Sequence, residues 1–184
     1  MRWNVRAAVL ALSIGLIAVG AQGQSQAPQM PMGGVGSQPS SKVTAQEPAP
    51  LEISFDGRQE VWTPAKLAAL PQTTVKVYNE HAKAEQTYSG VPLIDLLTRL
   101  GVPSKPRGKQ FRLYLIAEGS DGYQVVYSLG EVTPDVHAGT VMVADTMDGK
   151  PIGEDGPLKI ISTEEKRPGR WVRNLVAIRV LTAE

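Results

Sequence analysis

The chain has 184 residues, of which 42% are hydrophobic and none is cysteine. The lack of cysteine excludes disulfides, thiolate metal ligands, haem attachment and a cysteine nucleophile. The formal net charge is only +1, with 19 basic and 18 acidic residues. This balance argues against a nucleic-acid-binding surface.

Residues 1–21 have the three-part pattern of a secretory signal peptide. A basic start with Arg2 and Arg6 precedes an uncharged apolar run over residues 7–19, and small residues follow. The alternative is a membrane anchor, but the run is shorter than the ~20 apolar residues that span a bilayer. We therefore expect cleavage, a periplasmic or secreted protein, and no membrane contact after the signal is removed.

Residues 22–50 are rich in Gln, Pro, Ser, Gly and Ala and contain no aromatic residue. Such a segment buries too little apolar surface to offset the entropy that ordering would cost. It is predicted to be a disordered linker. The folded part is then one domain over residues 51–184, which is large enough for a hydrophobic core.

Short runs of β-branched and alternating apolar residues predict about seven strands in this domain. They are expected over residues 51–55, 73–78, 111–117, 123–127, 141–144, 158–161 and 175–181. The clearest helix is predicted over residues 88–101, where four leucines recur at helical spacing. Two shorter helical turns are indicated by capping patterns at Thr63 and Ser128. Because helices and strands do not alternate regularly, we expect an α+β fold with a mixed or antiparallel sheet.

A cluster of cations beside a tryptophan is the most suggestive feature of the domain. Lys166, Arg167, Arg170 and Arg173 crowd around Trp171. The arginine fork suits phosphate or carboxylate, and an indole offers a face for stacking. One interpretation is an anion pocket next to an aromatic platform. The other is a solvated loop whose charges pair with the neighbouring acidic residues at positions 164 and 165.

Other catalytic patterns are absent from the sequence. His81 and His137 lie in separate polar contexts, and neither has a second ligand at zinc spacing. No nucleophile elbow, phosphate-binding loop or dinucleotide fingerprint occurs. We therefore predict no catalytic residue and no metal ligand.

Several segments, in order and at matching spacing, resemble the molybdopterin-binding domain of sulfite-oxidase-like oxidoreductases. Tyr88-Ser89-Gly90-Val91-Pro92-Leu93 is similar to an aromatic-x-Gly-Val-Pro-Leu helix start, and Gly119-Ser120-Asp121-Gly122-Tyr123 to an Asp-Gly-Tyr turn. Asp148-Gly149-Lys150-Pro151-Ile152, Gly156-Pro157-Leu158-Lys159 and Arg170-Trp171-Val172-Arg173 are similar to three later blocks. The chain resembles a small, exported, single-domain branch that lacks the molybdenum-ligating cysteine.

The resemblance implies the α+β sulfite-oxidase-like fold and molybdopterin as the cofactor to consider. It also implies a set of cofactor-binding residues, namely Asp121, Tyr123, Lys166, Arg167, Arg170, Trp171 and Arg173. The family ligates molybdenum with a cysteine before the Gly-Val-Pro-Leu block, where this chain has Tyr78, Asn79 and His81 but no thiol. Stoichiometric molybdenum and sulfite-oxidase-type redox catalysis are therefore not expected.

Two functions remain open from the sequence. One is an oxidoreductase-like protein that binds a pterin-type or other anionic ligand and works with a periplasmic redox partner. The other is a non-catalytic periplasmic ligand- or protein-binding module that reuses the fold. The missing cysteine favours the second, whereas the retained Arg-Trp-Val-Arg block favours the first. Nucleic acid is not an expected partner of either.

Overall fold

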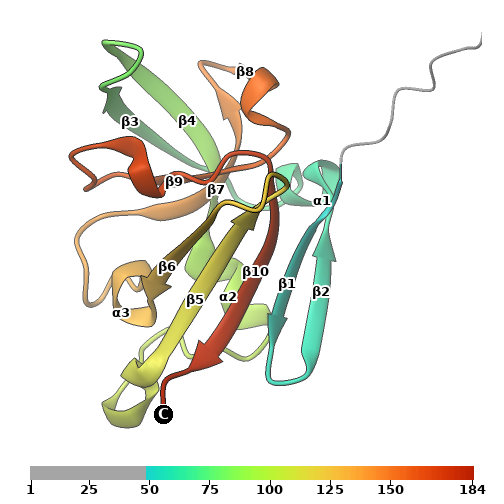
Figure 1. The fold of residues 1–184 in the computed structure, drawn as a ribbon, viewed down its shortest axis with the longest axis vertical. Coiled ribbons are helices and arrows are strands. Elements are labelled where there is room, and N and C mark those ends of the chain that lie inside the picture. The colour runs from blue at the N-terminus through green and yellow to red at the C-terminus, as the bar shows by residue number, and fades with distance from the viewer. Residues whose placement is uncertain (1–48) are drawn as a thin grey trace, which may run out of the picture. The chain divides into compact units, whose positions relative to one another are not determined.

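The computed structural model of the chain describes residues 49–184, which Figure 1 draws as a coloured ribbon. The expected signal peptide and the expected linker up to residue 48 lie outside the described residues. Within the described range, no helix is long and apolar enough to cross a bilayer.

The first sheet has the strand order β2–β1–β10–β5–β6. Its strands are β1 (Leu51–Phe55), β2 (Arg58–Trp62), β5 (Leu113–Gly119), β6 (Gln124–Ser128) and β10 (Leu175–Thr182). β1 and β10 run parallel, whereas the other neighbouring pairs are antiparallel. The sheet is therefore mixed, as the sequence predicts. Its one parallel pair joins β1, the first strand of the domain, to β10, the last.

The second sheet is antiparallel and centres on β7. Its strands are β3 (Thr73–Asn79), β4 (Ala84–Pro92), β7 (Val141–Met147), β8 (Lys150–Pro151) and β9 (Lys159–Ser162). β4 pairs with one edge of β7, and β8 and β9 each pair with part of that strand. The β3–β4 hairpin extends to the upper end of the molecule in Figure 1.

Helical segments are short. They are α1 (Pro64–Ala68), α2 (Leu93–Arg99), α3 (Leu129–Val132) and the 3₁₀ turns η1 (Gly108–Arg112), η2 (Gly153–Asp155) and η3 (Pro168–Arg170). The predicted caps are present: Thr63 Oγ1 accepts from the Lys66 N–H at 3.2 Å, and Ser128 and Glu131 form a reciprocal capping box. Local side-chain chemistry thus starts α1 and α3 where the sequence indicates.

The predicted helix over residues 88–101 is wrong in its first part. Tyr88 to Pro92 belong to β4 and pair with β7, and the helix begins only at Leu93. Proline favours a non-helical conformation in the residue before it and is tolerated at a helix start, so Pro92 separates strand from helix. The count of about seven strands is also too low, because β2, β4 and the two-residue β8 were not predicted.

Two buried clusters hold the domain together. The larger one joins both sheets to α2, with Ile53, Leu97, Leu115 and Val143 among its fully buried members. The smaller one lies on the second sheet around Tyr88 and Trp171, together with Val77, Met142, Ala144, Ile152 and Ile161. This smaller cluster supports the pocket described next.

Candidate functional site

A pocket of about 460 Å³ lies where the β3–β4 turn, the β5–β6 turn and the segments flanking β9 come together. It is lined by Asn79, His81, Asp121, Tyr123, Asp155, Lys159, Pro168, Gly169, Trp171 and Arg173. This volume falls within the range of about 300–1,000 Å³ that small-molecule sites occupy. The structure therefore brings together Asp121, Tyr123, Trp171 and Arg173 from the predicted set.

Close backbone approaches join the segments that carry these residues. At Gly119 a Cβ would lie 2.6 Å from the Arg173 carbonyl oxygen, so only glycine fits there. The Ser120 N–H donates to the Asn174 carbonyl at 2.9 Å, and the Asn174 N–H donates to the Asp155 carbonyl at 2.7 Å. Three loops that are distant in sequence are thus fastened side by side through Asn174.

Lys159 is the most buried charged residue of the pocket, with 6% of its side chain exposed. Its Nζ atom donates to Asp155 Oδ2 at 2.5 Å and lies 5.5 Å from the ring centres of both Tyr88 and Trp171. An ammonium carries three N–H donors, and within the described part of the chain this one forms a single hydrogen bond. Donor capacity therefore remains at the pocket wall.

The two rings beside Lys159 are fixed in place. Tyr88 and Trp171 meet edge to face, with ring centres 5.8 Å apart. The Trp171 indole N–H donates to the Ser162 carbonyl at 3.0 Å, and the Tyr88 hydroxyl donates to Gln86 Oε1 at 2.8 Å. Burial, reinforced by the negative charge of Asp155, raises the pKa of Tyr88 to about 12, so its hydroxyl stays protonated near neutral pH.

Arg173 is the accessible cation of the pocket. Its side chain is 63% exposed, and its Nη1 atom lies 3.6 Å from Asp155 Oδ1. Across the pocket, Asp121 Oδ1 accepts from the Tyr123 N–H at 3.0 Å, and the Tyr123 hydroxyl donates to the Gly169 carbonyl. The lining thus contains both positive and negative groups, with fewer cations and one more carboxylate than the predicted set.

Arg170 acts as a clamp within the protein, because its guanidinium binds two carboxylates of the chain and no pocket residue. Its guanidinium donates to Glu165 and, at 2.7 Å, to Glu131 Oε1, and its Cζ atom lies 4.8 Å from the Tyr127 ring centre. Arg170 is not among the residues that line the pocket. Its pairing with Glu165 agrees with the interpretation in which the loop charges pair with nearby acidic residues.

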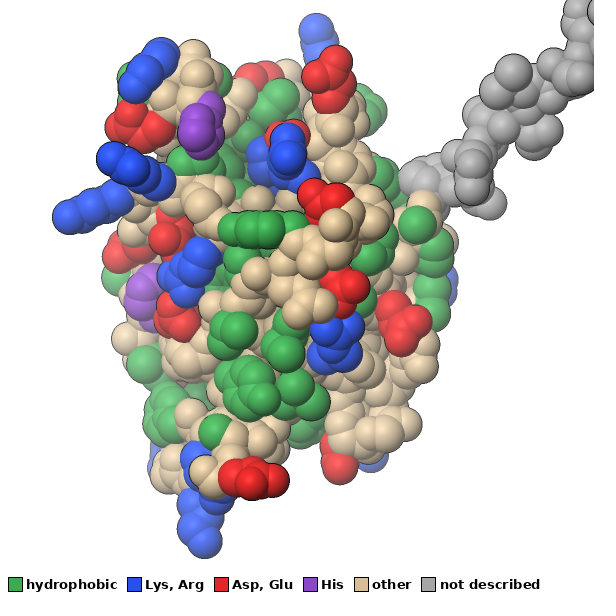
Figure 2. Space-filling view, in the orientation of Figure 1, with side chains coloured by type: hydrophobic (Ala, Val, Ile, Leu, Met, Phe, Trp, Pro, Cys, Tyr) green, Lys and Arg blue, Asp and Glu red, His purple; other side chains and the backbone are tan. Residues whose placement is uncertain are grey.

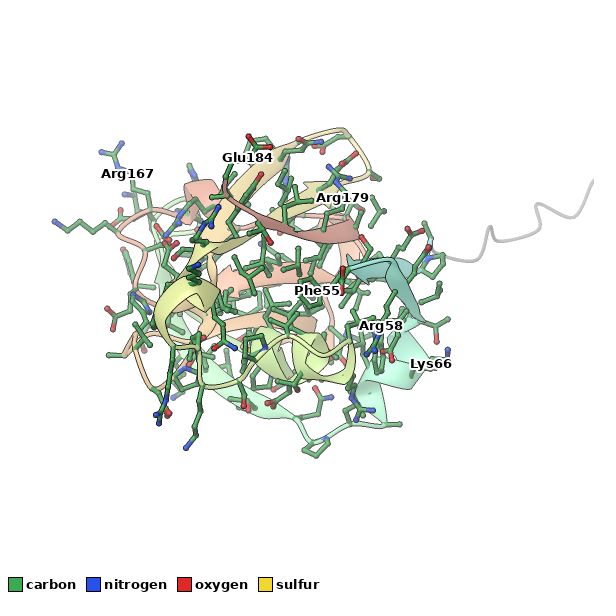
Figure 3. The ribbon with its side chains drawn as sticks, turned by 90° about the horizontal axis from the view of Figure 1, so that it is seen from below. Phe55, Arg58, Lys66, Arg167, Arg179 and Glu184 are labelled. Carbon is green, nitrogen blue, oxygen red and sulfur yellow. The ribbon has the colours of Figure 1, made fainter. Side chains whose placement is uncertain are left out.

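Lys166 and Arg167 are exposed and also do not contribute to the pocket lining. Figure 3 shows Arg167 extending away from the body of the protein. The 3₁₀ turn η3 follows these two residues and separates them from Arg173, which does line the pocket. Of the predicted cationic cluster, Arg173 alone lines the pocket.

The sequence prediction missed Asn79, His81, Asp155 and Lys159 as parts of the pocket. Lys159 stands in the Gly-Pro-Leu-Lys block already noted, and a lysine within a buried strand pattern was the available signal. No sequence pattern around Asp155 indicated that it belongs to a pocket. Its role depends on its contacts with Lys159 and Arg173, which come from later segments.

The donor set of the pocket does not fit molybdenum. The lining offers oxygen and nitrogen donors, and the chain contains no cysteine. Within residues 49–184, no group of three or more His, Asp or Glu side chains is placed to hold a metal ion. Molybdenum of the sulfite-oxidase type requires soft sulfur ligands, which these residues do not supply.

Comparison with known proteins gives one informative likeness. No family model and no curated protein sequence matches the chain. Among solved structures, the sulfane dehydrogenase SoxCD from Paracoccus pantotrophus is similar over 73% of this chain, with a TM-score of 0.56 and 23% identity. The likeness shows the fold. It supports the α+β sulfite-oxidase-like architecture expected from the sequence, although the match covers only 38% of the SoxCD chain.

Proposed function

We propose that this chain is an exported ligand-binding protein of the sulfite-oxidase-like fold. Its pocket takes a small molecule that carries both an anionic group and N–H donors, and a phosphorylated pterin is the class that the family resemblance suggests. The observation that carries this proposal is the buried Lys159 ammonium, which lines the pocket and has donors left over after its bond to Asp155.

The mixed charge of the lining supports a ligand of this kind. Arg173 and Lys159 suit a phosphate or carboxylate, because hydrogen bonds between charged partners are about twice as strong as neutral ones. The carboxylates of Asp121 and Asp155 are acceptors for N–H groups such as those of a pterin amidine. A ligand with negative charge alone would meet repulsion from both carboxylates.

Molybdenum redox chemistry is not part of the proposal. Sulfane oxidation, the activity named for SoxCD, is not carried over to this chain, because the pocket offers no thiolate and the likeness is one of fold. We expect protein purified from its native host to contain far less than one molybdenum per chain by elemental analysis. A stoichiometric content accompanied by turnover of a sulfur substrate would contradict this. Intact mass of the same material tests export, with an N-terminus near Gln22 expected.

The binding site is tested with a matched pair of arginine variants. Arg173→Gln removes the accessible cation of the pocket, whereas Arg167→Gln removes an exposed arginine of the same segment that does not line it. A charge-assisted hydrogen bond contributes about 1.5–3 kcal/mol. Arg173→Gln should therefore weaken a phosphorylated pterin about tenfold or more in calorimetric titration. Arg167→Gln should leave the affinity nearly unchanged.

Three ligands separate the contribution of the phosphate group from that of the pterin ring. A phosphorylated pterin should bind more tightly than the same pterin without phosphate, and more tightly than inorganic phosphate alone. Lys159→Met should abolish binding, with thermal unfolding measured alongside because the change leaves Asp155 without its main partner. Equal affinities for wild type, Arg173→Gln and Arg167→Gln, or no binding of any of the three compounds, would refute the site.

A further inference from the structure

A basic loop protrudes between α2 and β5, at the lower end of the molecule in Figure 1. Lys105, Arg107 and Lys109 fall within five residues of this loop, and all three are exposed. Phe111 follows on η1 and is 45% exposed. Figure 2 shows basic side chains projecting at this end, with hydrophobic and acidic side chains close to them. The loop therefore combines positive charge with exposed apolar surface.

The backbone of this loop is held in one conformation by reciprocal hydrogen bonds. The Arg107 N–H donates to Gln110 Oε1 at 2.8 Å, and the Gln110 N–H donates to the Arg107 carbonyl at 3.1 Å. Gln110 and Phe111 lie within η1 itself. The backbone of the loop is thus ordered before contact, which removes that part of the cost of binding.

The apolar part of the surface extends from the loop to the segment after α3. Val136 is 53% exposed, and a Cβ placed on Gly130 would contact Val136 at 3.6 Å and Phe111 at 3.8 Å. Phe111 and Val136 therefore both lie against Gly130 of α3. Two exposed apolar side chains next to three cations make a small, convex amphipathic surface.

Two carboxylates reduce the positive charge of this surface without cancelling its three cations: Asp135 lies beside Lys105, and Glu184 follows Ala183, whose N–H donates to the Arg112 carbonyl. Lys105 Nζ lies 3.6 Å from Asp135 Oδ2, and both side chains are largely exposed, so the pair is weak. Arg112 is directed elsewhere, because its Nε donates to the Ala183 carbonyl at 2.8 Å. Within the described residues, the ion pairs include none formed by Arg107 or Lys109.

We propose that this basic loop docks the protein onto an anionic lipid surface. The cations contact lipid phosphates, and Phe111 and Val136 insert at the boundary between headgroups and acyl chains. An acidic protein surface is the competing occupant. Lysine is depleted from the centres of protein–protein interfaces, and a protruding tip suits a planar partner, so the lipid surface is favoured. This differs from the expectation, drawn from sequence, of no membrane contact after signal removal.

The placement of the loop is compatible with ligand binding in the pocket. The β3–β4 hairpin, whose turn contributes Asn79 and His81 to the pocket, lies at the upper end in Figure 1, away from the basic loop. A molecule docked through the loop keeps that hairpin turned away from the lipid. The docking proposal does not depend on the identity of the pocket ligand.

The test is co-sedimentation of the exported protein with vesicles. Vesicles of phosphatidylcholine containing about one third phosphatidylglycerol should bind the protein, whereas pure phosphatidylcholine vesicles should bind it far less. Binding should weaken as salt is raised from about 0.1 M to 0.5 M, because the Debye length shortens from about 10 Å to less than half of that. Equal binding to both vesicle types would overturn the proposal, since it would show that the anionic headgroups do not contribute to binding.

Paired variants assign the binding to the loop. Arg107→Gln combined with Lys109→Gln should lower the partition coefficient by roughly twenty-five-fold, since each cation contributes about fivefold at an anionic surface. Phe111→Ser should lower it by about fivefold. The control, Lys76→Gln combined with Lys150→Gln, removes two exposed cations of the second sheet and should change nothing. All variants should keep their unfolding temperatures.

Two results would overturn the proposal. Unchanged sedimentation of the loop variants would place lipid binding elsewhere on the chain. Loop-dependent binding to an acidic polypeptide, combined with no binding to anionic vesicles, would assign the loop to a protein partner instead.

Discussion

Replacing Arg170 by Gln should destabilise the domain and loosen one wall of the pocket. The Arg170 guanidinium joins η3 to α3 through Glu131 and to its own loop through Glu165. The neighbouring Gly169 and Trp171 line the pocket. The backbone of this wall is also held by the Tyr127 hydroxyl, which donates to the Arg170 carbonyl at 2.5 Å.

The size of the effect follows from the contacts. Arg170 is 39% exposed, so each of its two ion pairs is discounted to about 0.5–1 kcal/mol. The contact of the guanidinium with the Tyr127 ring adds about 1 kcal/mol. The expected loss in the free energy of unfolding is therefore about 2–3 kcal/mol. For a domain of this size it corresponds to a fall in the unfolding temperature of roughly 10 °C.

The stability lost in Arg170→Gln should depend on pH, because one of the partners of Arg170 is the carboxyl of Glu131. Burial acts to raise the pKa of Glu131, but hydrogen bonds from Ser128 and Arg170 outweigh it and hold the pKa below its usual value. A carboxyl with a lowered pKa stabilises the fold above its unfolded pKa of about 4.3 and loses that contribution as pH falls through the folded value. The difference between wild type and Arg170→Gln should accordingly be full at pH 7 and shrink below pH of about 4.

Thermal unfolding followed by circular dichroism at pH 7 and at acid pH measures this difference. Arg179→Gln is the matched control, since Arg179 forms one ion pair, with Glu118, at a similar exposure. It should cost less than about 1 kcal/mol. A loss for Arg170→Gln no larger than for Arg179→Gln, or one independent of pH, would refute the role of Arg170 as a clamp.

Two further substitutions test a tightly packed glycine, Gly156, and a half-buried carboxylate, Asp145. Gly156 has φ of 92°, and a Cβ there would lie 2.8 Å from Asn174 Cα, so Gly156→Ala should cost more than about 2 kcal/mol in chemical denaturation. Gly149→Ala, with φ of 74° but open space, should cost only about 1 kcal/mol, and equal losses would contradict the packing argument. Burial raises the pKa of Asp145, outweighing hydrogen bonds at its own backbone and at Thr146, so its ionised form disfavours folding above the unfolded pKa. Asp145→Asn should therefore unfold at a higher temperature than wild type at pH 7 but not below pH of about 4, and a lower unfolding temperature at pH 7 would show this reasoning to be wrong.

Features that depend on neighbouring residues were predicted well from the sequence. Thr63 and Ser128 cap helices because their hydroxyls reach backbone N–H groups three residues away. The α+β class follows from short strands that do not alternate with helices, and the mixed sheet bears it out. Leu93, Leu96, Leu97 and Leu100 are buried as the predicted stripe, although the helix starts at Leu93 and not at Tyr88.

Side-chain directions in the cationic segment were beyond the reach of sequence reasoning. Arg170 and Arg173 are three residues apart and chemically identical, yet one is bound to Glu131 and Glu165 and the other lines the pocket. Arg170 belongs to η3, whereas the Arg173 backbone lies against Gly119. The pairing of Arg170 with Glu165 lies within one loop and was among the expected alternatives, whereas its pairing with Glu131 and the approach of Arg173 to Asp155 join segments that are distant in the chain.

The sequence by itself therefore determined the kinds of local structure, the absence of any thiolate ligand and the segments from which a site is built. Only the tertiary structure decided that Lys159 is buried between two rings against Asp155, and that Asp121 and Arg173 share one pocket. It also decided that β1 pairs with β10, more than a hundred residues away. The physical reason is range: caps and turns are settled within a few residues, whereas burial and charge pairing depend on packing between segments that are distant in the chain.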